Sequence, residues 1–393
     1  MFALIHAASK RTAQMVLAAV TGLALIACQP VSLGGGLGSG PAIDSSKPVP
    51  VALLLPKGSG ASGDAVLSTS LENAARMAIA DLNGVRIDLR VYDTAGNAAT
   101  AQAVADRAVA DGAKIILGPV YAGNANAVGH AVARSGINVL AFSNNASIAG
   151  GNVFVLGNTF QNTADRLASF AVRQGKGRIV LVHSNDVAGQ TGAAAIQTGV
   201  ARAGGSIVST VAHEFSQQGV VNAVPQVRSA VQSGGADAIF LTANTAGALP
   251  LFSQMLPEQG VSPSTVQYIG LTRWDIPAQT LDLPGVQGGW FALTDPNRAA
   301  QFDGRYQSTY GAPPHPIGSL AYDGIAAIGA LVAQGRGLGG ADLTQAAGFQ
   351  GTGGIFRLLP DGTNQRGLAV ATIQNRQVVV IDPAPRGFGG AGF

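Results

Sequence analysis

This chain of 393 residues has little charge, a single cysteine and few aromatic residues. Charged residues make up 11% of the chain and hydrophobic residues 47%, whereas a typical soluble domain carries about 25% charge. Disordered chains combine low hydrophobicity with high charge, so this composition excludes disorder. The formal net charge is only +3, and no basic run occurs. We therefore expect no nucleic-acid partner.

Motifs for catalysis and metal binding are missing as well. No G-x-S-x-G elbow occurs, and no S-x-x-K precedes a K-T-G, so a penicillin-type transpeptidase is excluded. The 5 histidines are too dispersed to suggest a zinc site. We expect a protein that is not an enzyme and binds no metal. An exported hydrolase remains the catalytic alternative, and it would need turnover that disappears when His183 or Ser184 is changed.

One glycine-rich segment matches a nucleotide-binding pattern. Residues 58–63 read G-x-G-x-x-G between a predicted strand and a predicted helix, the context of a dinucleotide site. Pro56 and Lys57 lengthen the turn, and the acid at the next strand end, Asp93, lies thirty positions after Gly63 instead of about twenty. We therefore expect no cofactor and interpret the glycines as part of a loop at a cleft.

The N-terminus is typical of an export signal. Lys10 and Arg11 precede an apolar stretch over 15–27 that is too short to span a bilayer comfortably. The stretch ends in Leu25-Ile26-Ala27-Cys28, which resembles the lipobox of bacterial lipoproteins. The resemblance implies that residues 1–27 are a signal peptide and that Cys28 is the lipidation site. It is the only cysteine of the chain.

The residues after Cys28 predict how the protein is attached. Gln29 stands where an aspartate retains many lipoproteins in the inner membrane, which favours the outer membrane if the organism has two. Residues 28–48 are rich in Gly, Ser and Pro and predict a flexible tether of roughly 25 Å. No later stretch has about 18 uninterrupted apolar residues, so we expect the lipid alone to anchor the protein in the periplasm.

From residue 49 onward, predicted strands alternate with predicted helices. Apolar runs indicate buried strands, and segments with helical periodicity lie between them, ended by glycines. The first series of strands covers 51–55, 85–92, 115–117 and 139–142, and the second covers 179–183, 206–211, 238–241 and 268–271. The pattern then loosens, with a further strand at 290–293. Parallel strands need long crossovers, so this alternation predicts two α/β lobes with parallel sheets and helices on both faces. Residues 355–359 and 369–381 read as late strands.

Several motifs in order resemble a known family. They are Val51-Ala52-Leu53-Leu54-Leu55-Pro56, Ile115-Ile116-Leu117-Gly118-Pro119, Val139-Leu140-Ala141-Phe142-Ser143 and the segment from Gly354-Ile355-Phe356 to Asp361-Gly362. With them the chain resembles the leucine/branched-chain amino-acid-binding family of type 1 periplasmic binding proteins, the substrate-binding proteins of ABC transporters. It is also similar to penicillin-binding-protein activator lipoproteins. Both resemblances imply two Rossmann-like lobes joined by a three-crossing hinge.

The resemblance also implies domain boundaries. We expect crossings near 156–159, 271–274 and 334–340. The first lobe would then comprise 49–157 plus 273–335, and the second 158–272 plus 336–381. Residues 382–393 are rich in proline and glycine and are expected to form a loose tail.

In such folds the ligand lies where loops leave the carboxyl ends of the strands. Polar and aromatic residues of those loops are the ligand-binding candidates, although each of them could instead serve only to build a turn. The candidates are Ser62, Tyr121, Ser143, Asn144, Asn145, Asn185, Asp186, Asn244, Arg273 and Trp274.

The candidate site departs from the family's amino-acid binders. By resemblance, two hydroxyls that hold the ligand carboxylate would fall on Gly123 and Asn145, and the acid that holds the ammonium would fall near Gly247. Burying a zwitterion without such partners costs several kcal/mol. Asp186 or Arg273 could replace these contacts in a different geometry.

Together these observations predict a lipid-anchored, non-catalytic protein that binds a small polar, amino-acid-like ligand and delivers it to an ABC permease. The alternative is an activator that contacts a peptidoglycan synthase.

Overall fold

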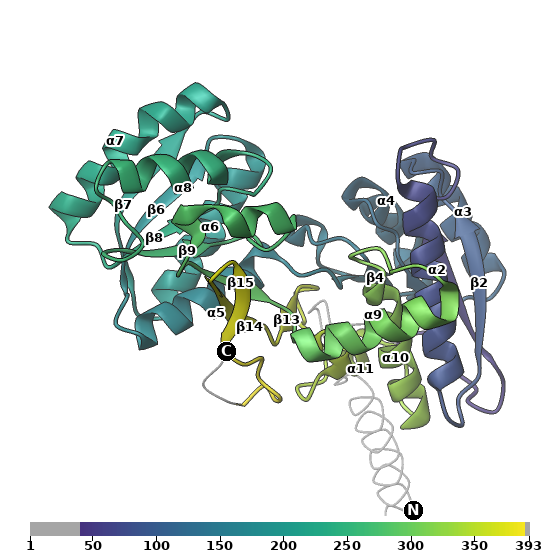
Figure 1. Cartoon of the computed structure of the whole chain (residues 1–393). Coiled ribbons are helices and arrows are strands. Elements are labelled where there is room, and N and C mark those ends of the chain that lie inside the picture. Colours follow the sequence, from purple (N-terminus) through teal and green to yellow (C-terminus); the bar gives the residue numbers. More distant parts are fainter. Residues whose placement is uncertain (1–39, 390–393) are drawn as a thin grey trace, which may run out of the picture. The chain divides into compact units, whose positions relative to one another are not determined.

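The computed structural model describes residues 40–389, which form two α/β lobes with mainly parallel sheets (Figure 1). We call the part built on the five-stranded sheet the first lobe and the part built on the seven-stranded sheet the second lobe. The expected fold class of two Rossmann-like lobes is confirmed. Residues 1–27 and the proposed lipidation site, Cys28, lie outside the described residues.

The sheet of the first lobe is entirely parallel. Its strand order is β2-β1-β3-β4-β5. The strands are β1 (Val49–Leu55), β2 (Ile87–Asp93), β3 (Ile115–Leu117), β4 (Val139–Ala141) and β5 (Val153–Val155). Residues 51–55 are apolar without alternation because helices cover both faces of the sheet. All five strands therefore end at one edge, where the loops that were expected to bind ligand begin.

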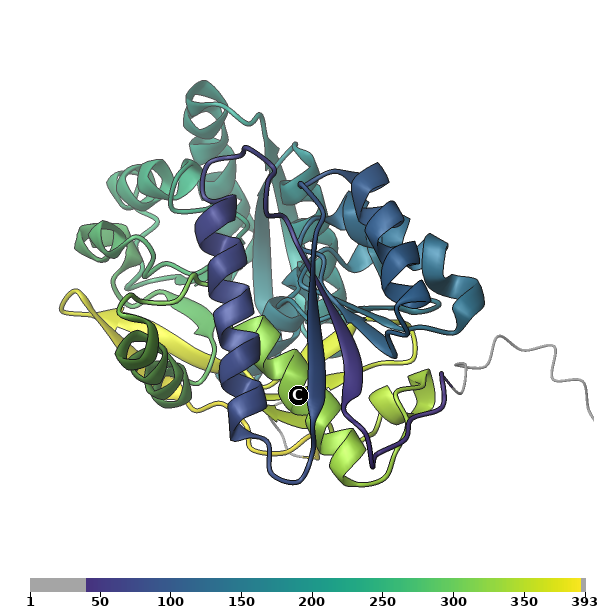
Figure 2. The same ribbon diagram turned by 90° about the vertical axis from the view of Figure 1, so that its right-hand side faces the viewer.

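Helices lie on opposite faces of this sheet, as Figure 2 shows for the N-terminal helix and the pair that follows it. One face carries α2 (Asp64–Asp81), α9 (Pro296–Tyr310) and α10 (Ser319–Ala333). The other carries α3 (Ala98–Ala110) and α4 (Ala122–Val132). Ala74 of α2 and Ile325 of α10 are both fully buried in the first core, so helices far apart in sequence share one interior.

The sheet of the second lobe is parallel except at one edge. Its order is β15-β14-β10-β9-β8-β6-β7, and only β14 and β15 run antiparallel to their neighbours. The strands are β6 (Arg178–Ser184), β7 (Ser206–His213), β8 (Ala238–Leu241), β9 (Gln267–Gly270), β10 (Trp290–Leu293), β14 (Ala369–Gln374) and β15 (Gln377–Asp382). Asn375 and Arg376 join the last two strands with positive φ angles of 52° and 61°, as a two-residue hairpin turn requires.

The helices of the second lobe also divide between the two faces. Helices α5 (Phe160–Arg173) and α6 (Val187–Arg202) pack on one face. Helices α7 (Gln217–Gly234) and α8 (Ala248–Glu258) pack on the other. Helix α6 begins at residue 187, where the Asp186 side chain accepts the backbone N–H of Gly189 and caps the helix.

A small antiparallel sheet, absent from the sequence-based expectation, completes the first lobe. It consists of β11 (Phe349–Gly351), β12 (Gly354–Leu358) and β13 (Asn364–Arg366), after the short helix α11 (Gly340–Leu343). Its side chains Phe349 and Phe356 belong to the core of the first lobe. Short strands with few apolar residues give a weak sequence signal, which explains why only 355–359 was expected as a strand.

Two of the three crossings lie elsewhere than expected. The first crossing lies between Val155 and Phe160. The second follows Leu293, not 271–274, because β10 pairs with β9 and buries Phe291 in the second core. The third crossing lies between Arg366 and Ala369, not at 334–340, because the small sheet packs on the first core and ends with β13. Buried strands are apolar in both lobes, so the amino-acid composition of a strand could not show to which lobe it belongs.

Both ends of the described chain are held more firmly than expected. The tether was expected over 28–48, but Ile43 packs against the first core and the carbonyl of Ser46 accepts a hydrogen bond from Arg86. The tail was expected to be loose from residue 382, but the Arg357 guanidinium lies 4.5 Å from the centre of the Phe388 ring. Contacts with the lobes, which composition cannot reveal, fix both segments.

No helix among residues 40–389 is long and apolar enough to cross a bilayer.

Candidate ligand cleft

A cavity of about 600 Å³ lies where the chain crosses between the lobes. All three crossings contribute to its wall, together with the loop after β4, the loop after β9, and helices α9 and α10. The polar and charged residues of the wall are Asn144, Asn158, Arg273, Thr294, Asp303, His315, Ser319, Asp323, Thr352 and Arg366. A molecule bound here would touch both lobes at once.

Buried polar groups tie the crossings together beneath the cavity. The Nε atom of Arg366 donates to the carbonyl of Leu156 at 3.0 Å, and its Nη1 lies 3.5 Å from Oδ2 of Asp323. The other oxygen of Asp323 accepts the backbone N–H and the hydroxyl of Thr352, at 2.7 and 2.9 Å. Burial lowers the pKa of Arg366, while the Asp323 carboxylate opposes that shift. This pair is satisfied internally and forms the floor of the cavity.

A second polar link joins the first and third crossings. The Asn364 amide nitrogen donates to the carbonyls of Val155 and Gly157, at 2.6 and 2.9 Å, and its oxygen accepts from the Asn162 amide at 2.7 Å. Asn162 belongs to α5 of the second lobe and Val155 to the first-lobe sheet. The crossings are therefore held in register by hydrogen bonds rather than by apolar packing alone.

Two titratable residues of the wall have no charged partner among the described residues. Asp303, on α9, is exposed and forms no ion pair with a described residue, and partial desolvation of its carboxylate raises its pKa. Burial lowers the pKa of His315, in the loop before α10, which favours its neutral form. Because the Asp303 carboxylate has no cation beside it, a ligand that brings a positive charge to the cavity would stabilise its ionised form.

Arg273 is the cation on the second-lobe side of the wall. Its guanidinium makes two hydrogen bonds to Asp275, one from Nε at 2.9 Å. The Arg273 side chain is 41% exposed, so part of it still faces solvent beside the cavity. The arginine can approach a ligand anion, but it shares its charge with Asp275.

Of the ten predicted ligand residues, only Asn144 and Arg273 line this cavity. Trp274, expected to offer a stacking surface, is fully buried in the second core. A Cβ atom on Gly270 or Gly289 would lie within 2.3 Å of its indole ring, so both glycines make room for it. The expected stacking role is therefore wrong in this structure, and Trp274 acts as core packing behind the loop that carries Arg273.

The candidate ligand residues of the first lobe mostly form hydrogen bonds within or between their own loops. Asn145 caps the short 3₁₀ helix at 146–148 through its side-chain oxygen, and the Ser143 hydroxyl accepts the backbone N–H of Asn145 at 3.1 Å. The Tyr121 hydroxyl donates to Asp64 at 2.6 Å, and this hydrogen bond raises the pKa of Tyr121. Ser62 is exposed in the glycine-rich loop and lies outside the cavity.

Asp64 bears on the nucleotide alternative. Its carboxylate lies in the first turn of α2 and accepts hydrogen bonds from Ser59 at 2.5 Å and from Tyr121. A negative charge thus already occupies the helix start that a phosphate would need. Gly58, Gly60 and Gly63 of the same loop have positive φ, in agreement with the interpretation that glycine is needed there for the backbone path.

The second-lobe candidates are similarly engaged. Asn185 donates to Glu214 at 3.3 Å. Asp186 accepts the Ser184 hydroxyl, which lowers the pKa of Asp186, and caps α6. Asn244 accepts the backbone N–H of Leu249 through its own carbonyl, at 3.2 Å. None of these three residues lines the hinge cavity.

The residues required by the hydrolase alternative do not form a nucleophile and base. The His183 ring nitrogen lies 2.9 Å from the backbone oxygen of Ser184, not from its hydroxyl. That hydroxyl donates to Asp186 instead. Activation of a serine requires a hydrogen bond between its hydroxyl and the base, and this geometry does not provide one.

Sequence reasoning missed Asp303, His315, Asn158 and Thr294. The rule that ligands lie at strand ends points to Thr294, which follows β10, once that strand is assigned to the second sheet. No comparable signal marks Asp303, because it lies within a helix, or His315, which lies in a loop between two helices. Their proximity to the crossings is visible only in three dimensions.

A slightly larger cavity of about 650 Å³ lies elsewhere on the second lobe, lined by residues of α5 and of the C-terminal segment, among them Arg166 and Arg386. It includes none of the loops at the carboxyl ends of the parallel strands, so we take the hinge cavity as the ligand cleft.

Comparison with known proteins agrees with this geometry. A family profile described as "Periplasmic binding protein" matches residues 48–377. The search of curated proteins found no match.

Solved structures with similar folds include a putative branched-chain amino acid ABC transporter protein from Rhodospirillum rubrum. It has a TM-score of 0.72 and 18% identity, and the match covers 85% of this chain and 100% of that one. An ABC transporter substrate-binding protein from Desulfitobacterium hafniense in complex with Leu has a TM-score of 0.60, 18% identity and coverage of 85% and 100%. A solute-binding protein from R. palustris in complex with benzoate has a TM-score of 0.55, 18% identity and coverage of 88% and 98%.

Proposed function

Because this chain belongs to the periplasmic binding protein family, we propose that it is a lipid-anchored solute-binding protein that holds a small polar, amino-acid-like ligand in the hinge cavity for ABC-type transport. Family membership confirms the resemblance indicated by the strand-end motifs. The ligand, the anchor and the permease partner are part of the proposal.

The position of the cavity is the observation that carries this function. Its wall combines residues from the loop after β4, the loop after β9 and all three crossings. A ligand with contacts on both lobes stabilises the closed form over the open one, because its binding energy is larger when both walls are present. Hinge closure of this kind gives a transporter a signal that the protein is loaded.

Charge in the cavity supports an amine-bearing ligand. The unpaired carboxylate of Asp303 replaces the acid that the family pattern would place near Gly247, and it comes from α9 instead of the second lobe. Arg273 faces the opposite charge of a zwitterion, and Asn144 and Thr294 supply neutral hydrogen-bonding groups. Leu and benzoate in two similar structures show that one fold serves different ligands, so the charged groups are the better guide.

Export and anchoring complete the proposal. The apolar stretch before Cys28 and the Leu25–Cys28 sequence support cleavage and acylation, and Gln29 favours outer-membrane attachment in a cell with two membranes. We propose no catalytic role, because members of this family act by binding and the His183–Ser184 geometry lacks a nucleophile and base. Mass spectrometry of the mature N-terminus tests the acyl group directly.

A thermal-shift screen with amino acids and amines tests the ligand class. A ligand present at 100 times its Kd stabilises the folded state by about 2.7 kcal/mol. The Asp303→Asn variant should lose this response, while Asp106→Asn, an exposed acid on α3, should keep it. Absence of any response to the whole panel would contradict the transport proposal. Native mass spectrometry of protein purified without refolding would then identify any retained molecule.

A second candidate function is activation of a peptidoglycan synthase. One observation favours it: Gly123 and Gly247 carry no side-chain donor or acceptor, and the Asn145 oxygen is already used as a cap. The pattern by which the family holds amino acids is therefore absent. A pull-down with the purified synthase distinguishes the two functions, and capture that persists in the Asp303→Asn variant would favour activation over transport.

A further inference from the structure

We propose that the edge of the first lobe opposite the ligand loops is a docking surface for anionic phospholipid headgroups. The surface, which we call the basic edge, consists of Arg86, Lys114 and Arg134 together with the segment 40–48 that leads to them. This inference rests on the proposed lipid anchor, because the anchor brings this edge to the membrane.

Strand register places the three cations along one edge. Arg86 precedes β2, and its carbonyl accepts the backbone N–H of Val49. Lys114 precedes β3, and its N–H donates to the carbonyl of Pro50. Arg134 lies in the 3₁₀ turn that leads into β4. These residues stand at the amino ends of strands that neighbour one another in the order β2-β1-β3-β4, within roughly 15 Å at the usual strand spacing.

The three cations are free to meet an external charge. Arg86 and Arg134 are exposed and Lys114 is half-buried. None of them forms an ion pair with a described residue, and Arg86 donates only to the carbonyl of Ser46.

The acids near this edge already have partners. Asp44 lies 3.5 Å from Lys47, and Asp342 lies 3.1 Å from Arg336. Asp88 pairs with Arg90, and Asp111 accepts the Tyr92 hydroxyl at 2.8 Å. Asp111 keeps its charge, because a tyrosine hydroxyl does not neutralise a carboxylate. Three unpaired cations against this one acid still leave the basic edge with a net charge of +2.

The position of the first described residues indicates that a lipid membrane is the partner of the basic edge. Gly40 packs against Leu338 and Gly339, and the segment 40–48 continues along the first lobe to Arg86. Cys28 lies twelve residues before Gly40, a length that spans at most about 43 Å even when fully extended. Acylation at Cys28 therefore places this edge within reach of a lipid surface. Each basic residue near an anionic membrane raises the membrane partition coefficient by about tenfold or less.

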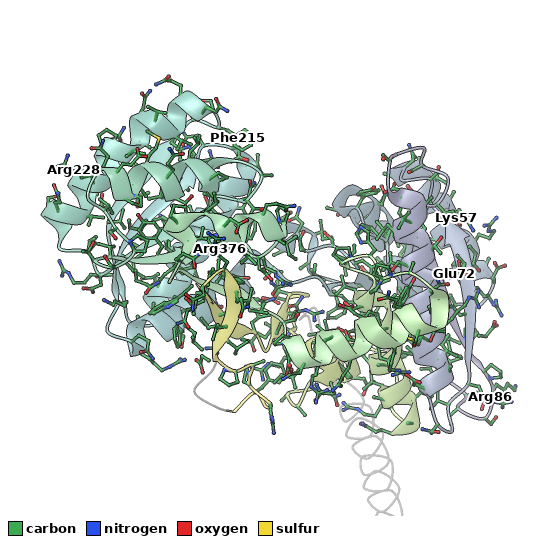
Figure 3. The ribbon with its side chains drawn as sticks, in the orientation of Figure 1. Lys57, Glu72, Arg86, Phe215, Arg228 and Arg376 are labelled. Carbon is green, nitrogen blue, oxygen red and sulfur yellow. The ribbon has the colours of Figure 1, made fainter. Side chains whose placement is uncertain are left out.

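The basic edge and the ligand loops lie at opposite ends of the first lobe. Strand β1 has 7 residues, which corresponds to about 23 Å between its ends. Figure 3 shows Arg86 at the lower end of the first lobe and Lys57, which follows β1, toward its upper end. Docking by the basic edge leaves the ligand loops on the side that faces away from the lipid.

Vesicle co-sedimentation tests the proposal. The protein is residues 28–393 with Cys28→Ser, which carries no acyl group and keeps every described residue. We expect it to bind vesicles of phosphatidylglycerol and phosphatidylethanolamine, not vesicles of phosphatidylcholine. Binding should disappear at about 1 M salt, where the Debye length is about 3 Å. The triple variant Arg86→Glu, Lys114→Glu, Arg134→Glu should reduce the partition coefficient on the order of 100-fold.

A matched control has the same change in charge. The triple variant Lys57→Glu, Arg228→Glu, Arg376→Glu alters exposed cations outside the basic edge, labelled in Figure 3, and should bind like the parent. The double variant Lys114→Glu, Arg134→Glu leaves the Arg86 to Ser46 contact intact and should still lose about 20-fold or more. Circular dichroism melts establish that the variants fold.

Two results would overturn the proposal: no binding of the parent to anionic vesicles, or equal binding by both triple variants. Neither result touches the anchor or the ligand site. Acylation is measured separately by mass spectrometry, and ligand binding by thermal shift should be unchanged in the triple variant of the basic edge.

Discussion

The loops at the strand ends and the cavity at the hinge contain similar residues but use them differently. In the loops, polar side chains complete local structure: Asn145 and Asp186 cap helices, and Tyr121 is bonded to Asp64. At the hinge, Asp303 and His315 have no charged partner among the described residues. A polar residue at a strand end is therefore a weak indication of ligand binding until its local partners are known.

The largest expected effect is a loss of stability that distinguishes a core-packing role of Trp274 from a ligand-binding role. Trp274→Ala should lower the free energy of unfolding by about 3–5 kcal/mol, because it removes a fully buried indole that fills the space between Gly270 and Gly289. Urea denaturation measures this loss, and ligand affinity under native conditions should be unchanged. A small loss of stability together with a large loss of affinity would restore the stacking role that the sequence predicted.

The next effect concerns the polar link between crossings. Asn364→Ala leaves the carbonyls of Val155 and Gly157 and the Asn162 amide without a partner, and should cost about 1–3 kcal/mol. Small-angle scattering of the ligand-free variant should also show a changed balance of open and closed forms. Asn97→Ala, which removes the exposed cap of α3, is the control and should change stability without changing this balance.

A loop residue should affect stability but not binding. Asp186→Ala removes the cap of α6 and should cost about 1 kcal/mol at neutral pH. The pKa of Asp186 is lowered in the folded state, so its stabilising effect is present above the usual pKa of 3.8 and is lost as the pH falls through the folded pKa. The stability difference between parent and variant should therefore shrink in acid, as measured by urea titrations across pH. A loss of ligand affinity in this variant would count against the division between loops and hinge.

The smallest effect on stability belongs to Asp303. Its pKa is raised in the folded state, so ionisation at neutral pH costs stability, and the cost disappears below the usual pKa of 3.8. Asp303→Asn should thus make the ligand-free protein slightly more stable at pH 7 and unchanged in strong acid. The same variant should lose binding of an amine ligand, measured by calorimetry. If the variant is less stable than the parent at pH 7, Asp303 has a structural role instead.

Sequence patterns predicted the elements of each lobe better than the assignment of elements to lobes. The strands 115–117, 238–241 and 290–293 have the predicted bounds because short apolar runs between glycines and helices are clear signals. The lobe to which 290–293 belongs depends on its pairing with β9, a contact that no local pattern reveals. The same reason explains why the small sheet around Phe356 was assigned to the wrong lobe.

The candidate site was less predictable than the fold. Asn144 and Arg273 were found because the fold places strand ends at the cleft. Trp274 was misjudged because sequence does not show whether an aromatic residue at such a position points outward or into the core. Asp303 and His315 could not be predicted, since they reach the cavity from α9 and from the following loop by tertiary packing.

The discontinuity of both lobes has a consequence for how the polypeptide acquires its structure. The interior of the first lobe needs Phe302 and Ile328, and that of the second needs Ala371 and Ile373, all from the last quarter of the chain. Neither interior can close while that quarter is still emerging on the far side of a translocon. Both lobes must therefore mature late. A truncation before Phe302 would leave neither lobe able to fold independently, and one before Ala369 would leave the second lobe incomplete.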